Sequence, residues 1–342
     1  MSFWQNLPAP FFVLAPMADV TDAPFRRMIA KYSAHIRSDG SFGGPDVMWT
    51  EFVSADGLVR ATPEGKVKLM ADLKYTEEER PIVAQLFTSN EEHMEQASRL
   101  CLELGFDGVD INMGCPDKSI EKQGCGSAMI KHPEVATKII LAAKRGAKMG
   151  EIGGIPVSVK TRLGYNRDEL ETWLPALLAT EPAAITVHAR TRKEMSKVPA
   201  RWERVARAVE IRNEMQGKDI LKTRILGNGD VLSLKDAKEK VLASGADGAM
   251  LGRAIFGNPW LFHPELDVAT IPLTDKLRVM VEHTKLFEEL LPFKNFSIMK
   301  KHYKAYVKDF SGAHELRAEL MEQNTSAEIE TVTEKFLRSI NG

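Results

Sequence analysis

The sequence has almost no excess of charge of either sign, because 46 lysines and arginines stand against 47 aspartates and glutamates. A basic surface over the whole molecule is therefore excluded, and any contact with nucleic acid must come from a local patch. Cysteine is scarce as well. The odd number of cysteines, Cys101, Cys115 and Cys125, fits a reducing compartment better than a disulfide framework.

Signals for export or membrane insertion are missing too. Residues 1–10 contain no basic side chain, and the apolar run 11–18 is shorter than the roughly 20 residues that span a bilayer. The 342 residues contain no repeat of solenoid period, and they suffice for one large domain and a smaller one. We therefore expect a cytoplasmic monomer with no membrane partner.

The first three quarters of the chain alternate apolar, strand-length segments with amphipathic ones. The apolar segments are 11–17, 46–53, 81–87, 108–114, 155–164, 183–190, 224–230 and 248–255. The amphipathic segments are 22–32, 90–104, 133–143, 167–178, 202–215 and 234–243. Several of these begin with helix start signals, at Asp22, Asn90 and Ser233. Eight strand-helix units over about 250 residues predict parallel strands in a (β/α)8 TIM barrel.

The alternative is a doubly wound open sheet. Its first strand would lead into a glycine-rich turn, but residues 16–21 lack the Gly-x-Gly-x-x-Gly pattern of dinucleotide-binding folds, so the barrel is favoured. Residues 34–45, rich in glycine and serine, predict an enlarged loop before the second strand.

After Pro264 the alternation stops and helical periodicity continues to the end. We therefore predict a barrel domain over 1–264 and a small all-helical domain over 265–342. The clearest helix is predicted over 296–310, where an apolar stripe runs at spacings of three and four. The stripe consists of Phe296, Met299, Tyr303, Tyr306 and Phe310. Another face of this helix carries Lys300, Lys301, Lys304 and Lys308.

The fourth predicted strand carries residues that a strand normally excludes. Asp110 and Asn112 share one of its faces, which is costly unless they meet partners or a ligand. The strand ends in a Gly-Cys-Pro turn that leaves Cys115 at the carboxyl mouth of the predicted barrel, where active sites lie. Cys115 is therefore a candidate for chemistry, and its alternative is a small buried hydrophobe, the common fate of a free cysteine.

Cations gather at the ends of the next two strands. The fifth strand places Lys160 and Arg162 on one face, and the sixth does the same with His188 and Arg190. Adjacent cations at a barrel mouth favour an anion or an electron-rich ring. The alternative for each residue alone is a strand-end charge that reaches solvent.

The seventh and eighth strands end where many barrels bind a phosphate group. Glycines there let backbone N–H groups approach the oxygens, and an arginine offers a bidentate fork. The residues concerned are Asn228, Gly229, Asp230, Gly252 and Arg253. A tight turn is the alternative for the Gly-Asn-Gly-Asp segment.

The stretch around Cys115 resembles the signature of the tRNA-dihydrouridine synthases, flavin enzymes that reduce a uridine of tRNA. The matching residues are Asn112, Gly114, Cys115 and Pro116, then Gly124, Gly126, Ser127 and Ala128. The similarity extends to residues 50–55, 188–192, 301–303 and 315–317. The chain departs from the family at Ala189, usually a glycine, and in the loop 193–201, which usually carries Tyr-x-Gly and an acidic residue.

This resemblance implies FMN as cofactor, NADPH or NADH as reductant, tRNA as partner and Cys115 as proton donor. The implied FMN cradle consists of Pro16, Met17, Gln85, Lys160, His188, Asn228, Gly229, Asp230, Gly252 and Arg253. The implied substrate-binding residues are Asn112, Arg162, Arg190, Lys300, Lys301 and Lys304. No metal site is expected, because no histidine has ligand-like partners at metal spacing.

Saturating the C5–C6 bond of uracil requires a hydride and a proton. An ordinary thiol, with a pKa of about 8.5, is mostly protonated near pH 7, so Cys115 can supply the proton. Lys118 and Lys122 follow closely in the sequence, and whether they lower that pKa is left open by the sequence alone. Three other functions stay open: an FMN-dependent oxidoreductase of a free pyrimidine, a Schiff-base aldolase that uses Lys160, and an RNA-binding protein that has lost catalysis.

Overall fold

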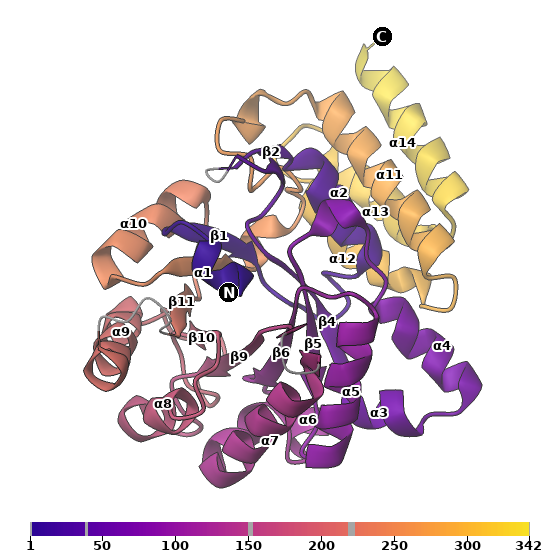
Figure 1. Ribbon diagram of the computed structural model, residues 1–342. Coiled ribbons are helices and arrows are strands. Elements are labelled where there is room, and N and C mark those ends of the chain that lie inside the picture. The colour runs from indigo at the N-terminus through magenta and orange to yellow at the C-terminus, as the bar shows by residue number, and fades with distance from the viewer. Residues whose placement is uncertain (1, 38–39, 150–152, 218–222, 342) are drawn as a thin grey trace.

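The computed structural model describes residues 2–37, 40–149, 153–217 and 223–341. Within these residues, eight parallel strands form one sheet in the order β1-β12-β11-β10-β9-β6-β5-β4. The two ends of the sheet meet, because Val13 and Val47 form a parallel bridge and the Leu14 N–H donates to the Val47 carbonyl at 3.1 Å. The closed (β/α)8 barrel is therefore confirmed, and the doubly wound sheet is excluded (Figure 1).

Each barrel strand overlaps a predicted one. The strands are β1 (Phe11–Leu14), β4 (Met48–Ser54), β5 (Ile82–Phe87), β6 (Gly108–Met113), β9 (Val157–Arg162), β10 (Ala184–His188), β11 (Arg224–Asn228) and β12 (Gly248–Leu251). Most end earlier than predicted, because their last residues leave the hydrogen-bonded ladder and enter the loops at the barrel mouth.

Helices surround the barrel (Figure 1). The main ones are α2 (Ala23–Tyr32), α3 (Ala55–Arg60), α4 (Pro63–Asp72), α5 (Glu91–Glu103), α7 (Pro133–Gly146), α8 (Leu170–Leu178), α9 (Trp202–Gln216) and α10 (Leu234–Ser244). The predicted caps are confirmed, since Asp22, Asn90 and Ser233 each accept a hydrogen bond from the backbone N–H three residues on. The short α1 (Phe3–Asn6) and α6 (Lys118–Glu121), like α3 and α4, have no counterpart among the predicted helices.

The predicted loop at 34–45 contains a small hairpin. β2 (His35–Ile36) pairs antiparallel with β3 (Phe42–Gly43), while residues 38–39 lie outside the described part of the chain. A second small hairpin joins β7 (Lys148–Met149) to β8 (Gly153–Gly154). Neither hairpin belongs to the barrel.

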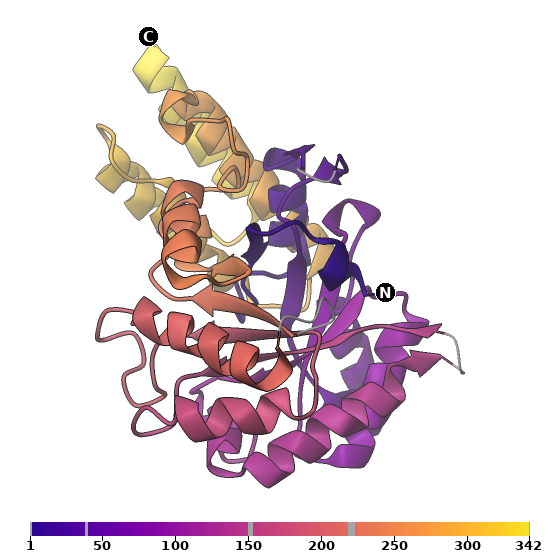
Figure 2. The same ribbon diagram turned by 60° about the vertical axis from the view of Figure 1, so that its left-hand side comes forward.

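Four helices follow the barrel: α11 (Leu273–Leu290), α12 (Lys300–Tyr306), α13 (Ala313–Glu322) and α14 (Ser326–Asn341). They gather on one side of the molecule, in orange to yellow, and α11 packs beside α2 (Figures 1 and 2). None of the helices in the described ranges is both long and apolar enough to cross a membrane.

The helix predicted over 296–310 is wrong in extent. A 3-10 turn, η5 (Phe296–Met299), precedes α12, and α12 ends at Tyr306. Phe310 still packs on the hydrophobic core, but across a break, with its ring centroid 5.8 Å from that of Phe336 in α14. Lys308 lies beyond the helix as well, so the basic face on α12 is shorter than the sequence predicts.

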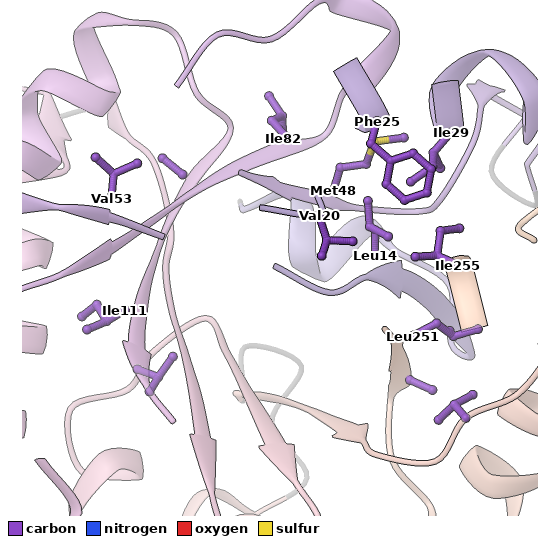
Figure 3. Packing of buried hydrophobic residues seen from close by; sticks show 14 of the residues in the cluster. Leu14, Val20, Phe25, Ile29, Met48, Val53, Ile82, Ile111, Leu251 and Ile255 are labelled. Atoms are coloured by element: carbon purple, nitrogen blue, oxygen red, sulfur yellow. The ribbon is translucent and has the colours of Figure 1, made fainter. Parts of the chain in front are cut away.

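One hydrophobic cluster joins the barrel to the helical region. It includes Leu14 of β1, Phe25 of α2 and Tyr303 of α12, and Figure 3 shows Leu14 and Phe25 beside Ile29 and Met48. The Phe25 ring also stacks on His283 of α11, with centroids 4.8 Å apart. The barrel and the helices that follow it share one hydrophobic core, so the core does not mark a division between them. The domain boundary after residue 264 therefore stays a prediction.

Candidate active site

The carboxyl ends of the barrel strands surround a pocket of about 750 Å³. That volume is typical of a small-molecule site. The predicted cofactor and barrel-mouth residues all line it: Pro16, Met17, Gln85, Asn112, Cys115, Lys160, Arg162, His188, Arg190, Asn228, Gly229, Asp230, Gly252 and Arg253. The fold therefore brings together residues that the chain distributes over the ends of seven strands.

Polar side chains inside the barrel form the floor of this pocket. Gln85 Nε2 donates to Asp110 Oδ2 at 2.7 Å, and Asn112 Nδ2 donates to Gln85 Oε1 at 3.2 Å. Ser158 Oγ donates to the other Asp110 oxygen at 2.6 Å. Burial raises the pKa of Asp110 to about 6, against the hydrogen bonds from Gln85 and Ser158. The polar residues that looked costly in the strand therefore satisfy one another, and this network holds Gln85 and Asn112 in place.

The turn that carries Cys115 is held from two sides. Asn112 Oδ1 accepts from the Gly114 N–H at 3.1 Å and from the Cys115 N–H at 2.9 Å. The Cys115 carbonyl accepts from the Ser127 N–H at 2.9 Å. Gly126 has a φ of +60°, and a Cβ there would lie 2.6 Å from the Cys115 carbonyl oxygen. The asparagine and the glycine-rich loop thus fix the backbone of Cys115.

The Cys115 thiol is half-buried and stays protonated at neutral pH. Burial raises its pKa above the ordinary value, and the cations Lys160 and Arg162 oppose this without reversing it. Lys118 and Lys122 are not among the main groups that shift this pKa. Both lysines are exposed, so water screens their charges from the thiol.

Lys160 is a cation with few partners in a buried position. Its Nζ lies 3.4 Å from Asn228 Oδ1, a long contact for an ammonium that can donate three hydrogen bonds. Burial lowers its pKa to about 8, helped by Arg162, while Asp110 opposes the shift. At pH 7 the ammonium remains charged, so it attracts an anion or an electron-rich ring.

His188 is neutral at physiological pH. Burial, followed by the nearby Arg162, Lys160, Arg190 and Arg253, holds its pKa well below the ordinary value. Arg190 Nη1 lies 3.2 Å from His188 Nε2. A guanidinium has no acceptor atom, so Nε2 must accept, and the imidazole proton sits on Nδ1.

The ends of β11 and β12 form a charged corner around Asp230. Its carboxylate pairs with Arg190 on one oxygen and with Arg253 Nη2, at 2.5 Å, on the other. Gly229 has a φ of +118°, and a Cβ there would lie 3.0 Å from the His188 ring and 2.9 Å from Ala200 Cβ. Position 229 therefore requires a glycine. Asp230 already occupies one of the hydrogen-bond donors of the Arg253 guanidinium.

A sequence model of the family described as Dihydrouridine synthase (Dus) matches residues 13–341. The chain belongs to the dihydrouridine synthase family. The resemblance found in the sequence is therefore confirmed, and the chain is a member of a family of enzymes.

Relatives of this chain match over nearly its whole length. One from Staphylococcus aureus (strain COL), named "Probable tRNA-dihydrouridine synthase", is 38% identical over 339 residues, which cover 98% of this chain and 95% of the relative. One from Bacillus subtilis (strain 168), named "Probable tRNA-dihydrouridine synthase 2", is 38% identical and covers 98% and 97%.

Among solved structures, a complex of 2-naphthoyl-CoA reductase matches this chain with a TM-score of 0.51. The identity is 13%, and the match covers 73% of this chain and 49% of that one. A likeness at so low an identity concerns the fold alone, and it agrees with the barrel topology described above.

Several residues that line the pocket were not among the site residues predicted from the sequence. They are Phe52, Asp117, Met195, Ser196, Val231, Leu232 and Met250. Phe52 follows a shift of register in β4, so strand alternation cannot assign its face. Met195 lies in the loop where the chain departs from the family pattern, and its carbonyl accepts from Arg162 Nη1 at 3.2 Å. The residues outside the strands enter the site through loop geometry, which periodicity does not predict: Asp117, Met195, Ser196, Val231 and Leu232.

The three predicted lysines of α12 lie outside the set that lines the pocket. Lys304 is exposed, while Lys300 and Lys301 are half-buried. Burial lowers the pKa of Lys301, and the carboxylates of Asp19 and Asp22 oppose this. Because Asp19 follows the pocket residues Met17 and Ala18, α12 adjoins the loop after β1 at the barrel mouth.

No group of three or more histidine, cysteine, aspartate or glutamate side chains is placed to hold a metal ion within the described residues. The described cysteines are all free.

Proposed function

We propose that the protein reduces the C5–C6 double bond of a uridine in tRNA to 5,6-dihydrouridine, with FMN as cofactor and NADPH or NADH as reductant. The observation that carries this proposal is a protonated cysteine at the mouth of a cationic barrel pocket, in a chain of the dihydrouridine synthase family. The names of relatives that match 98% of the chain support a uridine of tRNA as the substrate.

The pocket residues fit an FMN. The lining contains four permanent or near-permanent cations, Lys160, Arg162, Arg190 and Arg253, against two carboxylates, Asp117 and Asp230, so its field favours an anionic ligand. The buried ammonium of Lys160 suits the electron-rich edge of a reduced isoalloxazine ring. When bound there, a flavin would supply hydride chemistry, with the nicotinamide nucleotide as the source of reducing equivalents.

The strand ends at Gly229 and Gly252 suit the phosphate of that cofactor. Arg253 is 65% exposed at its side chain and can reach an oxygen while it keeps its contact with Asp230. The Nδ1 proton of neutral His188 is free to be donated without adding charge. Pro16, Met17 and Gln85 complete the proposed cradle, and Gln85 is held by Asp110 and Asn112.

Cys115 gives the proton in this proposal. The S–H bond breaks, a C–H bond forms at C5 of the uracil, and the thiolate then takes a proton from water. The raised pKa keeps the thiol protonated until it is needed. Asn112 and Arg162 flank Cys115 and are the proposed contacts to the base, with Arg190 beside them.

The proposal is tested by spectroscopy of the purified protein. Flavin absorbance is expected, to be bleached by NADPH without oxygen and restored by unmodified tRNA. Restoration by free uracil or dihydroorotate instead would indicate the free-pyrimidine oxidoreductase. A colourless protein that does not take up FMN, but is trapped by borohydride with a phosphorylated sugar, would indicate an aldolase using Lys160. A protein that binds tRNA without flavin turnover would have lost catalysis.

The basic face of α12 is the proposed docking surface for tRNA phosphates. Reversing two charges, with Lys300→Glu and Lys304→Glu together, is expected to raise the KM for tRNA and to reduce the salt slope of binding by about 2. Steady-state kinetics at several salt concentrations measure both. Lys235→Glu with Lys238→Glu, on α10, is the control with the same charge change at exposed sites. An equal effect of both pairs would show that α12 is not a specific surface.

A further inference from the structure

A chain of charged and polar contacts links the Cys115 loop to the loop after β10, two strands along the barrel from β6. Arg192, in the loop after β10, donates from Nε to Glu121 Oε1 at 2.8 Å and pairs through Nη2 with the other oxygen. Glu121 ends α6, three residues before the loop that holds Cys115. Its Oε1 also lies 2.8 Å from Ser127 Oγ. We call this set of three residues the latch: Arg192, Glu121 and Ser127.

The latch reaches the backbone of Cys115 itself. Ser127 donates its N–H to the Cys115 carbonyl, and its hydroxyl lies 2.9 Å from the same oxygen. The hydroxyl has one proton, and a carboxylate is a stronger acceptor than a carbonyl. While Glu121 is ionised, the hydroxyl therefore bonds to it, and Ser127, beside Gly126, is connected through Glu121 to Arg192 in the loop after β10.

The ion pair between Arg192 and Glu121 is stronger than a surface ion pair, because it is largely buried and further contacts hold Arg192 in place. Glu121 is 10% exposed and Arg192 is 24% exposed at the side chain. Burial acts to raise the pKa of Glu121, but hydrogen bonds from Arg192 and Ser127 outweigh it and hold the pKa below the ordinary value. Arg192 is fixed in turn, since its N–H donates to the Gly164 carbonyl at 2.9 Å and its guanidinium lies over the Tyr165 ring. Three mouth loops are thus joined, those after β6, β9 and β10.

We propose that the latch positions Cys115 for proton donation, with Glu121 and Arg192 as positioning residues. The role rests on the function proposed above. Neither residue lines the described pocket, so both act through the loop that carries the thiol. A shift of about 1 Å in a reacting group can cost on the order of 10²-fold in rate. A loop that is otherwise held by the Asn112 amide and Gly126 therefore gains from a third attachment.

The first test measures the thiol without any turnover. In the FMN-loaded protein, Arg192→Gln and Glu121→Gln are each expected to speed alkylation of Cys115 by iodoacetamide on the order of tenfold, since the loop opens more often. Peptide mass spectrometry separates this label from any on the buried Cys101. Arg204→Gln is the matched control, because Arg204 forms a bidentate pair with Asp168 away from the Cys115 loop. Unchanged labelling in both latch variants would overturn the proposal.

The second test separates positioning from substrate contact. Both latch variants are expected to lower kcat for tRNA while KM and the reduction of the flavin by NADPH stay at wild-type values. The double variant is expected to be no worse than either single one, and Arg192→Lys is expected to recover part of the rate. A change confined to KM would show that Arg192 contacts tRNA directly and would overturn the latch. Failure of wild-type protein to reduce tRNA would instead overturn the proposed function, and the labelling result would still stand.

Discussion

A Cys115→Ala variant is expected to bind FMN and to be reduced by NADPH normally, yet to reduce tRNA about 10²- to 10⁴-fold more slowly. The variant removes the proton donor, while the cations and glycines that hold the cofactor are left unchanged. Stopped-flow measurement of flavin reoxidation by tRNA, without oxygen, isolates the affected step. A variant that reoxidises at the wild-type rate would show that the proton comes from another group.

The control for this variant is Cys125→Ala. Cys125 is buried and packs in the same small cluster as Phe87 and Ile120, and burial raises the pKa of its thiol to about 11. It is absent from the pocket lining, so its loss is expected to leave the rate of reoxidation near the wild-type value. A large loss in Cys125→Ala would show that packing around the loop, rather than the Cys115 proton, controls the rate.

The pH dependence of the same step follows from the pKa of Cys115. Because burial raises that pKa, the thiol is expected to hold its proton through neutral pH. The rate of reoxidation should therefore stay level near neutrality and fall only at alkaline pH, as the thiolate forms. In Cys115→Ser the hydroxyl does not titrate in this range, so the slower residual rate is expected to lack the alkaline fall.

The barrel and its pocket could be predicted from the sequence for a physical reason. Strands of a parallel barrel are buried, so they appear as apolar runs, and their alternation assigns Lys160, Arg162 and His188 to the inner face. The predicted extent of the helix over 296–310 was wrong, because an apolar stripe indicates only that its residues contact the core. Phe310 makes that contact from beyond the end of α12. Hydrophobic periodicity therefore identified which positions are buried, but it did not predict the end of the helix at Tyr306.

Contacts between distant loops could not be predicted. Arg192 and Glu121 are separated by 71 residues, and nothing in their local sequences marks them as partners. The Asp230 carboxylate was expected beside a phosphate, but it also orients Arg190 and Arg253, a role that depends on where two other strands end. Sequence patterns identify which face a residue occupies, whereas ion pairs depend on the closing of the barrel.

The contact between Lys294 and Glu51 also depends on the tertiary fold and could not be predicted from local sequence. It joins the helical region to the barrel. Lys294, in the loop after α11, lies among carboxylates, with Nζ 2.8 Å from Glu51 Oε2 and 3.0 Å from Asp72 Oδ1. Its side chain is 13% exposed and that of Glu51 is 7% exposed. Glu51 also accepts from the Asp19 N–H, in the loop after β1. A single ammonium thus neutralises several buried or half-buried oxygens.

Lys294→Met is expected to lower the free energy of unfolding by about 3–5 kcal/mol, because it leaves the Glu51 carboxylate buried without its cation. Urea denaturation at pH 7 measures the loss. Lys285→Met is the control, since Lys285 and Glu330 form an ion pair at 2.7 Å with side chains 49% and 46% exposed. Loss of that exposed pair is expected to cost less than about 1 kcal/mol. Equal losses would show that the Lys294 contact is no stronger than a surface pair.

The pH dependence of stability distinguishes a charge effect from lost packing. Burial raises the pKa of Glu51 and Lys294 opposes this, so removing Lys294 is expected to raise the pKa further. A carboxyl whose pKa is higher in the folded state binds its proton more tightly there, and its contribution to stability is lost as pH rises through that value. The deficit of Lys294→Met is therefore expected to be smallest in acid and to grow toward neutral pH. A deficit that is constant with pH would mean that Lys294 acts by packing its aliphatic chain, and the carboxylates would then have no part in holding the helical region on the barrel.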